Sequence, residues 1–469
     1  MIRSPRLLVF ALGYAAICMS IASSLGMLLV PAVAAEFDIP VAAAQWMLTV
    51  NMLAGAVVTP IVGRLIDGRY KRALLLTVLG VVLVGSVVAA TAVDFGVFLV
   101  GRALQGFTFG IGPITIALAR TQLPPAMVSK SIAALAITAA TGLGLGYPLT
   151  GLLSGLFGFR SAFVFAIIFV ISVAIIALIA MPGGADPAVV RRPFDLGGAM
   201  LFGVSLASLL LVVSEGPVLG WTSWPVIGLA VLFVASLAVW SFVELRVSYP
   251  LIDVRVLRYP DVLLANATGF AFGATMFICL SVASLVAQLP ASSGYGAGVS
   301  LLWAGFVMLP FSVGTISASR VFAWARQRVD PSVLLPGGAI CLPVALSILT
   351  IGHSELWQLL LGTLLCGFGT GITFGAMPVL IARQVEPSRV GSALGFNAVT
   401  RTAGNTLGAA IPGSIFAATA TAFGAPSDEG IVLAFGIGAG IGAAATVGIV
   451  VALLARRRPD ASGGRVVAP

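Results

Sequence analysis

Charged side chains are scarce in this sequence of 469 residues. Asp, Glu, Lys and Arg together make up only 9% of it, whereas they make up about a quarter of a typical soluble domain. No polar stretch is long enough to fold as a separate soluble domain. The scarcity of charge therefore excludes the water-soluble class of protein.

Histidine and cysteine are also rare. The chain has one histidine, His353, and four cysteines at unrelated spacings, Cys18, Cys279, Cys341 and Cys366. Enzymes and metal sites need clusters of such groups. We therefore expect no enzymatic activity, no metal, no cofactor and no disulfide, and we expect the cysteines to be inert buried thiols.

Long apolar runs take the place of charge. Hydrophobic residues make up 59% of the chain, and the mean hydropathy is +1.12. A helix needs about 20 apolar residues to cross ~30 Å of hydrocarbon, and runs of that length recur throughout. The sequence predicts an all-α membrane protein with fourteen spans. These lie near 7–30, 43–62, 73–92, 96–119, 131–155, 161–181, 196–214, 224–243, 262–287, 299–319, 332–351, 356–381, 391–420 and 431–455.

Basic residues fall almost entirely in the loops on one side of the membrane that these spans would cross. Of the 25 Lys and Arg, Arg160 alone lies on the other side, and Arg102 and Arg401 lie within spans. Basic loops stay in the cytoplasm, so we expect a protein of the inner (plasma) membrane with both termini cytoplasmic. The net charge of +9 then reflects topology and contact with anionic lipid headgroups, and not a nucleic-acid partner.

Two segments match each other eight spans apart. Residues 101–107 and 362–368 both open a span, and both spans end at an Ala-Arg pair followed by a proline-containing loop. Chance similarity of glycine-rich helices is the alternative, but it does not explain the recurring Arg and Pro positions. The match predicts two six-helix bundles in the same orientation with two inserted helices between them. The predicted parts are an N-terminal bundle at 1–181, a central insert at 182–260, a C-terminal bundle at 261–455 and a basic cytoplasmic tail at 456–469.

Three tryptophans, Trp221, Trp224 and Trp240, lie near the ends of the two inserted helices. Membrane proteins place aromatic rings at the interface between lipid and water. We therefore expect these three rings at the membrane surface.

The loop between the second and third predicted spans combines several bases with one acid, Asp67. Gly63 lets two backbones approach closely, and Asp67 can cap a helix N-terminus or pair with an Arg. We predict a latch that breaks and re-forms as the protein changes conformation. A plain stop-transfer loop is the alternative, but it does not explain the glycine and the acid. The predicted latch consists of Gly63, Asp67, Arg69, Lys71 and Arg72.

These residues resemble the signature loop of the major facilitator superfamily, G-x-L-x-D-x-x-G-R-R/K, with Tyr70 where the family has its second glycine. Three further segments are similar to motifs of the fourteen-helix drug:proton antiporters in that superfamily. They are Gln45-Trp46-x-x-Thr49, Arg102-x-x-Gln105-Gly106 and Gly142-x-x-x-Gly146-Tyr147-Pro148-x-x-Gly151. The resemblance covers the whole chain. It implies a multidrug efflux transporter that works by alternating access.

The fifth predicted span carries a hinge motif composed of Gly142, Gly146, Pro148 and Gly151. Small residues stacked on one helical face allow tight packing, and the proline allows a bend. The resemblance associates this kink with export. A generic helix-packing face is the alternative that the spacing alone leaves open.

Two arginines, Arg102 and Arg401, are predicted to lie within the membrane. A lipid-facing Arg costs about 3 kcal/mol or more, so both are expected to face the protein interior or a watery cavity. There they either contact the substrate and take part in proton coupling, or donate to backbone carbonyls and lock helices together. The other polar candidates for the pathway, each of which has helix-to-helix hydrogen bonding as its alternative, are Asn51, Gln105, Thr108, Asn266, Asn397 and Asn405.

None of the sixteen Asp and Glu is predicted to lie well inside a span. When the first span is aligned on Pro31, Ala22 stands where the related antiporters carry an Asp. Candidates for proton coupling are therefore Asp67, the acids at span edges, and His353, which we expect to be a solvated loop residue. Two arginines without an acid also favour an anionic or neutral amphipathic substrate over a cation.

The sequence thus predicts a monomeric secondary transporter that exports a small amphipathic compound, with protons as the coupling ion. An uptake carrier or uncoupled facilitator of the same fold is the alternative, and a membrane sensor is a remote one. A channel is disfavoured, because a twofold repeat with a hinge suits rocking halves better than a fixed pore.

Overall fold

The computed structural model describes residues 5–66, 68, 70–181, 183, 195–247, 250, 254–385, 390–420 and 425–456. Apolar sequence and the need to satisfy every backbone group within the membrane favour helices, and the described residues form helices and turns without a strand. The helices of the N-terminal bundle are α1 (Pro5–Ser24), η1 (Met27–Leu29), α2 (Val30–Glu36), α3 (Val41–Ala44), α4 (Trp46–Leu65), α5 (Lys71–Thr91), α6 (Phe95–Gln105), η2 (Gly106–Gly110), α7 (Ile111–Gln122), α8 (Pro125–Phe157) and α9 (Arg160–Ala180).

The remaining helices form the insert and the C-terminal bundle. The insert consists of α10 (Leu196–Leu219) and α11 (Trp224–Arg246), followed by η3 (Val254–Arg258). The C-terminal bundle consists of α12 (Pro260–Gln288), η4 (Ala291–Ser293), α13 (Leu301–Val307), α14 (Leu309–Ala325), α15 (Pro331–Ala339), α16 (Cys341–Ile351), α17 (Leu356–Gln384), α18 (Val390–Ala418) and α19 (Asp428–Arg456).

Twelve helical segments among the described residues are long and apolar enough to cross a membrane. α8 and α18 are continuous helices of 33 and 29 residues at the positions of the fifth and thirteenth predicted spans. The all-α membrane architecture is therefore confirmed, while the total of fourteen crossings stays a prediction.

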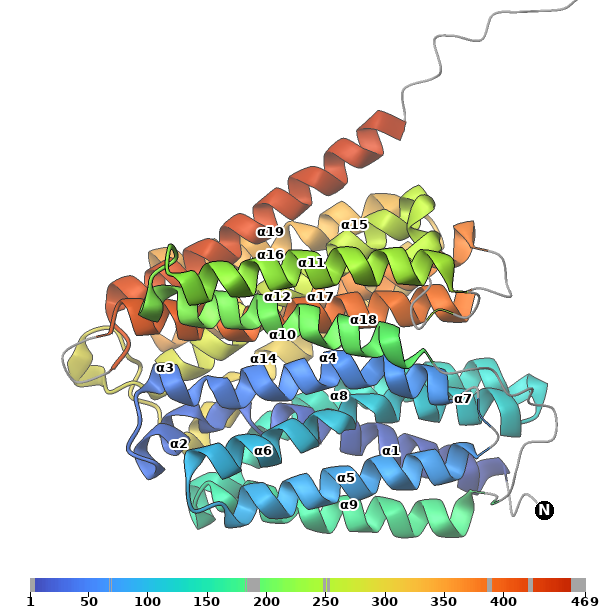
Figure 1. Cartoon of the computed structure of the whole chain (residues 1–469), viewed down its shortest axis with the longest axis horizontal. Helices are drawn as coiled ribbons and strands as arrows, with labels where there is room; N and C mark the ends of the chain where they lie inside the picture. Colours follow the sequence, from blue (N-terminus) through green and yellow to red (C-terminus); the bar gives the residue numbers. More distant parts are fainter. Residues whose placement is uncertain are drawn as a thin grey trace, which may run out of the picture.

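Figure 1 shows the two bundles side by side, with the helices running along the long axis and the insert lying across the junction of α4 and α18. We call the end at which α1 begins the basic end, because its loops carry the basic residues. The opposite end, with the loops at 37–40, 92–94, 220–223, 289–300 and 352–355, is the distal end. The division of the chain at 181 and 260 stays a prediction.

Several predicted spans are interrupted in the structure. The first breaks between α1 and η1, and the fourth contains the 3₁₀ segment η2. In the first span, Pro31 has no N–H for the carbonyl of Met27, four residues earlier. These breaks free backbone carbonyls inside the membrane, and neighbouring helices have to satisfy them.

The internal repeat recurs as contacts between helices. A Cβ built at Gly142 of α8 would lie 3.0 Å from the Cβ of Ser20 in α1, and one built at Gly404 of α18 would lie 3.0 Å from the Cα of Phe270 in α12. α8 thus packs on the first span of its bundle as α18 packs on the first span of the other. Glycine at matching positions keeps both pairs of helices in close contact.

The insert lies at the periphery of the molecule, since only 17% of the apolar window of α11 is buried against the rest of the chain. Trp221 and Trp224 are 58% and 86% exposed, as expected for rings at the membrane surface. Trp240, in contrast, is buried and packs on Phe202 with ring centroids 5.3 Å apart. The prediction of a surface position for Trp240 was wrong, because this ring holds α10 and α11 together.

Candidate functional site

The two bundles meet along one face of α8. A Cβ built at Gly151 would lie 2.8 Å from the carbonyl oxygens of Leu301 and Leu302 in α13. From the other side, a Cβ built at Gly305 would lie 2.8 Å from the Cα of Pro148. Only glycine allows backbones to approach this closely. We call this junction of the two bundles the seam.

The predicted hinge motif is divided between two neighbours. Gly142 and Gly146 face α1 within their own bundle, whereas Pro148 and Gly151 face α13 across the seam. At about 100° per residue, the nine residues from Gly142 to Gly151 turn the helix through two and a half revolutions, so the two glycines lie on opposite sides of it. The prediction of a single face of small residues was therefore wrong. α8 thus has small residues on two faces, one packed on α1 and the other on α13 of the second bundle.

The distal end of the seam is closed by hydrogen bonds from α12 to η1. Nε2 of Gln288 donates to the carbonyl of Leu28 at 3.1 Å, and Oγ of Ser284 donates to the carbonyl of Met27 at 3.4 Å. The Met27 carbonyl is available because Pro31 cannot donate to it. These bonds join the two bundles at the distal end and have to break if the seam opens there.

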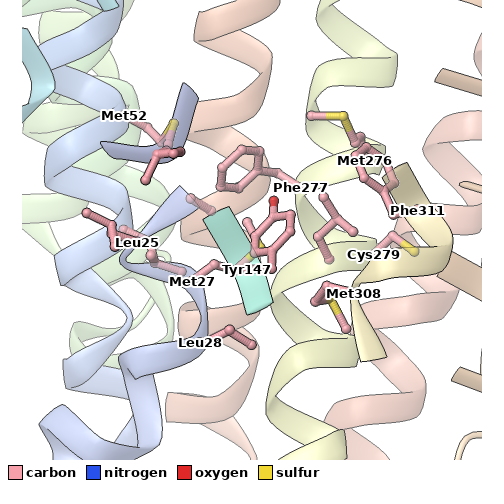
Figure 2. Packing of buried hydrophobic residues seen from close by; sticks show 14 of the residues in the cluster. Leu25, Met27, Leu28, Met52, Tyr147, Met276, Phe277, Cys279, Met308 and Phe311 are labelled. Atoms are coloured by element: carbon pink, nitrogen blue, oxygen red, sulfur yellow. The ribbon is translucent and has the colours of Figure 1, made fainter. Parts of the chain in front are cut away.

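A cluster of sulfur-containing and aromatic side chains fills the middle of the seam. Figure 2 shows Tyr147 of α8 between side chains of the N-terminal bundle and side chains of α12 and α14. Methionine is flexible and polarisable, so such a cluster can repack around apolar groups of different shape. The central cluster, all of it buried, consists of Leu25, Met27, Met52, Tyr147, Met276, Phe277, Met308 and Phe311.

Arg102 lies inside the N-terminal bundle and is 0% exposed. Its Nε donates to the carbonyl of Met47 at 3.2 Å, and its Nη1 donates to Oε1 of Gln105 at 2.6 Å. Its Nη2 is buried against Gly26 and makes no hydrogen bond within the described part of the chain. These contacts join α6 to α4 at the break in the first span. A role for Arg102 in the substrate or proton pathway stays a prediction.

Gln105 and Asn51 extend the same network. Nε2 of Gln105 donates to Oγ of Ser86 at 3.0 Å, and Nδ2 of Asn51 donates to the carbonyl of Arg102 at 2.9 Å. Thr108 is buried in η2 nearby. In this conformation Gln105 and Asn51 hold α4, α5 and α6 together, whereas the hydroxyl of Thr108 makes no hydrogen bond among the described residues.

Arg401 has different surroundings. It lies in the middle of α18, is partly exposed, and places its guanidinium carbon 4.7 Å from the ring centroid of Phe374 in α17. No hydrogen bond or ion pair forms at its side chain among the residues that the structure describes. An arginine without a partner at mid-membrane depth can accept an anionic group without losing an existing bond.

The remaining polar candidates surround Arg401 in the C-terminal bundle. Nδ2 of Asn397 donates to the carbonyl of Ala265 at 3.0 Å, and Nδ2 of Asn266 donates within its own helix at 2.7 Å. The amide nitrogen of Asn405 donates to the carbonyls of Arg401 and Gly273 at 3.3 and 3.2 Å. Asn397 and Asn405 therefore tie α18 to α12, whereas the bond of Asn266 stays within α12.

Two members of the predicted latch, Asp67 and Arg69, lie outside the described residues. Lys71 is buried, and Nη1 of Arg72 donates to the carbonyl of Met181 at 3.0 Å. Gly63 is exposed, and no described atom lies within 4 Å of the position of its Cβ. The expected close approach of backbones at Gly63 is therefore not seen. The latch itself stays a prediction.

The C-terminal bundle has an acid–base contact at its own basic end. Nη1 of Arg383 contacts the two carboxylate oxygens of Asp330 at 3.0 and 2.8 Å, and the same carboxylate caps α15 through the backbone N–H of Ser332 at 2.8 Å. The bonds from Ser332, with a smaller contribution from Arg383, lower the pKa of Asp330 to about 2. One carboxylate thus caps a helix and pairs with an arginine, which are the two roles predicted for Asp67.

Among the described carboxylates, only Glu244 is buried. It lies near the basic end of α11, beside Gly198 at the start of α10, where a Cβ would be 2.7 Å from Oε1 of Glu244. This position agrees with the prediction that the acids lie at the edges of spans. The sequence grouped Glu244 with the other acids at span edges, and its burial distinguishes it from them.

His353 is only 6% exposed, so the expectation of a solvated loop residue was wrong. Its Nδ1 lies 3.1 Å from the carbonyl of Leu349, and its Nε2 lies 3.0 Å from Oδ1 of Asp428 at the start of α19. The expectation of buried thiols is confirmed for Cys18, Cys279 and Cys366 but not for Cys341, which is only partly buried.

Sequence reasoning missed the residues that close the seam, which are Ser284, Gln288 and the central cluster. Gln288 ends a span and carries no motif, so no signal in one sequence could identify it. The methionines look like ordinary core residues until the fold brings two bundles together. Asp330, in contrast, follows from the repeat, because it precedes a span in the second bundle as Asp67 does in the first.

Comparisons with known proteins agree with this architecture. Residues 10–409 match the family model of the Major Facilitator Superfamily. The chain is 28% identical over 378 residues to the multidrug resistance protein Stp of Mycobacterium tuberculosis (strain CDC 1551 / Oshkosh), covering 80% of this chain and 69% of that one. It is 29% identical over 406 residues to the probable actinorhodin transporter of Streptomyces coelicolor, covering 82% and 68%. It is 25% identical over 382 residues to multidrug resistance protein 3 of Bacillus subtilis, covering 79% and 72%.

Solved structures show the same fold at low sequence identity. The peptide transporter PepTSo superposes with a TM-score of 0.67 at 15% identity, covering 98% of this chain and 99% of that one. The human organic anion transporter MFSD10 superposes with a TM-score of 0.62 at 15% identity, covering 95% and 99%. At this level of identity the likeness concerns the arrangement of helices alone.

Proposed function

The chain belongs to the Major Facilitator Superfamily and is a membrane transporter, and from this premise we propose that it exports a small amphipathic compound in exchange for protons. The named relatives support efflux, since two of the three are multidrug resistance proteins. We further propose that the basic end faces the cytoplasm, on the strength of the basic loops gathered there. The protein then acts as a monomer in the plasma membrane.

The observation that carries this proposal is the seam. The hydrogen bonds from Gln288 and Ser284 to η1, and the contact of Gly151 with α13, all lie at the distal half of the junction. Such contacts can separate as two rigid bundles rock, which is how secondary transporters alternate access. In this conformation the distal side is closed, so the substrate would enter from the basic end.

We propose that the substrate is anionic or neutral and that Arg401 contacts it. Arg401 is the better candidate of the two arginines, because Arg102 is fully enclosed and already donates two hydrogen bonds. The ring of Phe374 beside Arg401 and the neighbouring central cluster would accommodate the apolar part of the compound.

For the coupling ion we propose Glu244 as a proton-binding group, because it is the only buried carboxylate among the described residues. It lies in the insert, whose α10 packs on both α4 and α18. Movement of the two bundles would therefore change its surroundings.

Transport in inverted membrane vesicles tests the proposal. An anionic and a cationic dye of similar size are each followed with an imposed pH gradient and after its collapse. We expect gradient-dependent uptake of the anionic dye into the vesicles, and loss of that dependence in Glu244→Gln. Movement that ignores the gradient in the wild type would identify an uncoupled facilitator. Equal movement of the cationic dye would contradict the assignment of substrate charge.

A further inference from the structure

A cavity lies between the insert and the distal ends of α4 and α18. Its volume is about 320 Å³, and its lining comes from α3 and α4 of the first bundle, α10 of the insert and α18 of the second bundle. That volume lies at the lower end of the range for small-molecule sites. Val218, on its rim, is 63% exposed, so the cavity opens toward the outer surface of the helices.

Gln45 gives this cavity an unusual polar wall. Its side chain is 1% exposed, and neither Nε2 nor Oε1 has a hydrogen-bond partner among the described residues. Gly413 of α18 lies directly against it, since a Cβ there would be 3.1 Å from the Cβ of Gln45. Buried amides are almost always hydrogen-bonded. The Gln45 amide therefore brings an unpaired donor nitrogen and an unpaired acceptor oxygen to the wall of the cavity.

Glu215 supplies the only charge among the residues that line the cavity. The hydroxyls of Thr49 and Ser414 already donate to backbone carbonyls, at 3.4 and 2.6 Å, so toward the cavity they can only accept. The ring of Trp46 adds an electron-rich face, which attracts cations. A carboxylate, hydroxyl acceptors and an indole together select a positively charged head.

The rest of the lining is apolar, with Val218, Ala410, Ala417 and Ala420 on the walls. From this combination we propose a second binding site, for an amphiphile whose head carries a protonated amine beside a hydrogen-bond acceptor. The amine lies against Glu215 and Oε1 of Gln45, and the acceptor accepts a hydrogen bond from Nε2 of Gln45. The tail leaves along the exposed side of α10.

The same head chemistry comes from two sources, an ethanolamine lipid of the distal leaflet or a free amphiphilic amine. Because the site combines residues of both bundles, its occupant holds the distal end closed in either case. The site is separate from the central cluster and from Arg401, and its occupancy can be measured without transport.

Binding of dodecylamine to the full-length purified protein tests the site, with dodecanol and dodecanoate as matched probes of the same tail. We expect dodecylamine to bind at least about 10-fold more tightly than either, the ratio that one charge-assisted hydrogen bond supplies. Glu215→Gln and Gln45→Met should remove this preference, and Glu215→Asp should retain part of it. Glu429→Gln, at an exposed acid in the first turn of α19, should leave it intact.

Equal binding of the three probes, or an undiminished preference in Glu215→Gln, would overturn the proposal. Thermal unfolding of each variant verifies that it is folded. Mass spectrometry of the protein extracted from mixed ethanolamine and glycerol lipids then separates the sources. Retention of ethanolamine lipid that is lost in Glu215→Gln identifies a lipid site, whereas amine binding without lipid retention identifies a site for free amphiphilic amines.

Discussion

Two arginines lie within the membrane, and their surroundings separate their roles. Arg102 is enclosed and donates to the carbonyl of Met47 and the amide of Gln105. Arg401 stacks on Phe374 and makes no hydrogen bond within the described residues. Charge at that depth is costly unless it serves the fold or the substrate. The structure thus gives Arg102 a structural contact and leaves Arg401 available.

Replacing Arg401 tests that availability. Arg401→Gln should lower transport of an anionic dye by about 10-fold or more, because one charge-assisted contact is lost, with little change in thermal stability. Arg401→Lys should retain part of the activity. Dye transport and thermal unfolding are measured on the same preparations. Full activity in Arg401→Gln would show that this side chain does not contact the substrate.

Replacing Arg102, in contrast, should mainly lower the thermal stability of the protein. Arg102→Leu removes the bond to the Met47 carbonyl and leaves Oε1 of Gln105 without a partner, and a buried acceptor without a partner costs about 1–3 kcal/mol. The variant should unfold at a lower temperature, as followed by the fluorescence of a thiol-reactive dye. An unchanged unfolding temperature would mean that the bonds of Arg102 do not support the bundle.

The pKa of Asp330 gives a pH dependence that can be measured. Its pKa is lowered from 3.8 to about 2 by the bonds from Ser332 and Arg383, so its contribution to stability is present above pH ~4 and is lost as the pH falls toward ~2. The carboxylate is 51% exposed, so the effect is small. The stability difference between wild type and Asp330→Asn should shrink over that window. Glu429→Gln serves as the control, and a difference that stays constant with pH would contradict the assignment.

At the scale of single elements, α8 carries the connection between the bundles. Gly142 and Gly146 face α1, and Gly151 faces α13. In Gly151→Leu the new side chain would collide with the backbone of α13. Overpacking of this kind costs about 1–3 kcal/mol. We expect transport to be lost, with a smaller loss in Gly151→Ala. Gly80→Leu in α5, where no atom lies within 4 Å of the Cβ position, should remain active.

The helices themselves were largely predictable, because hydrophobic length specifies a span. α9 and α11 begin within one residue of their predicted positions, since Arg160 and Trp224 mark where the apolar run begins. The breaks in the first and fourth spans were not predicted. Pro31 is a local cause of the first break, but the position of each break also depends on contacts with other helices, such as that of Arg102 with Gly26, which no local pattern records.

The candidate site was less predictable than the spans. The motifs located Arg102, Gln105 and the hinge of α8, because each has a local signature. The partners of these residues come from distant segments, so the sequence could not tell a bonded arginine from an available one. Trp240 and His353 were misplaced for the same reason. Each lies near the end of an element, where packing by a neighbouring helix decides exposure.

At the scale of the whole molecule, the basic ends of the two bundles are expected to be held by matching acids. Asp330 fills this role in the second bundle by its contacts with Ser332 and Arg383. For the first bundle we predict that Asp67→Asn leaves expression largely intact and abolishes turnover, as measured by dye transport alongside quantified protein. Wild-type transport in this variant would mean that Asp67 does not act as a latch.

The central claim is that two bundles rock about the seam and open alternately at the two ends. Spin labels on a cysteine-free background report this directly, with one pair at Val93 and Ile351, which are 88% and 90% exposed at the distal end. A second pair lies at Thr121 and Gln327, both exposed at the basic end. When a transported dye or a change of pH shifts the conformation, the distance within one pair should lengthen while the distance within the other shortens. Distances that stay fixed, or that change in the same direction at both ends, would contradict alternating access.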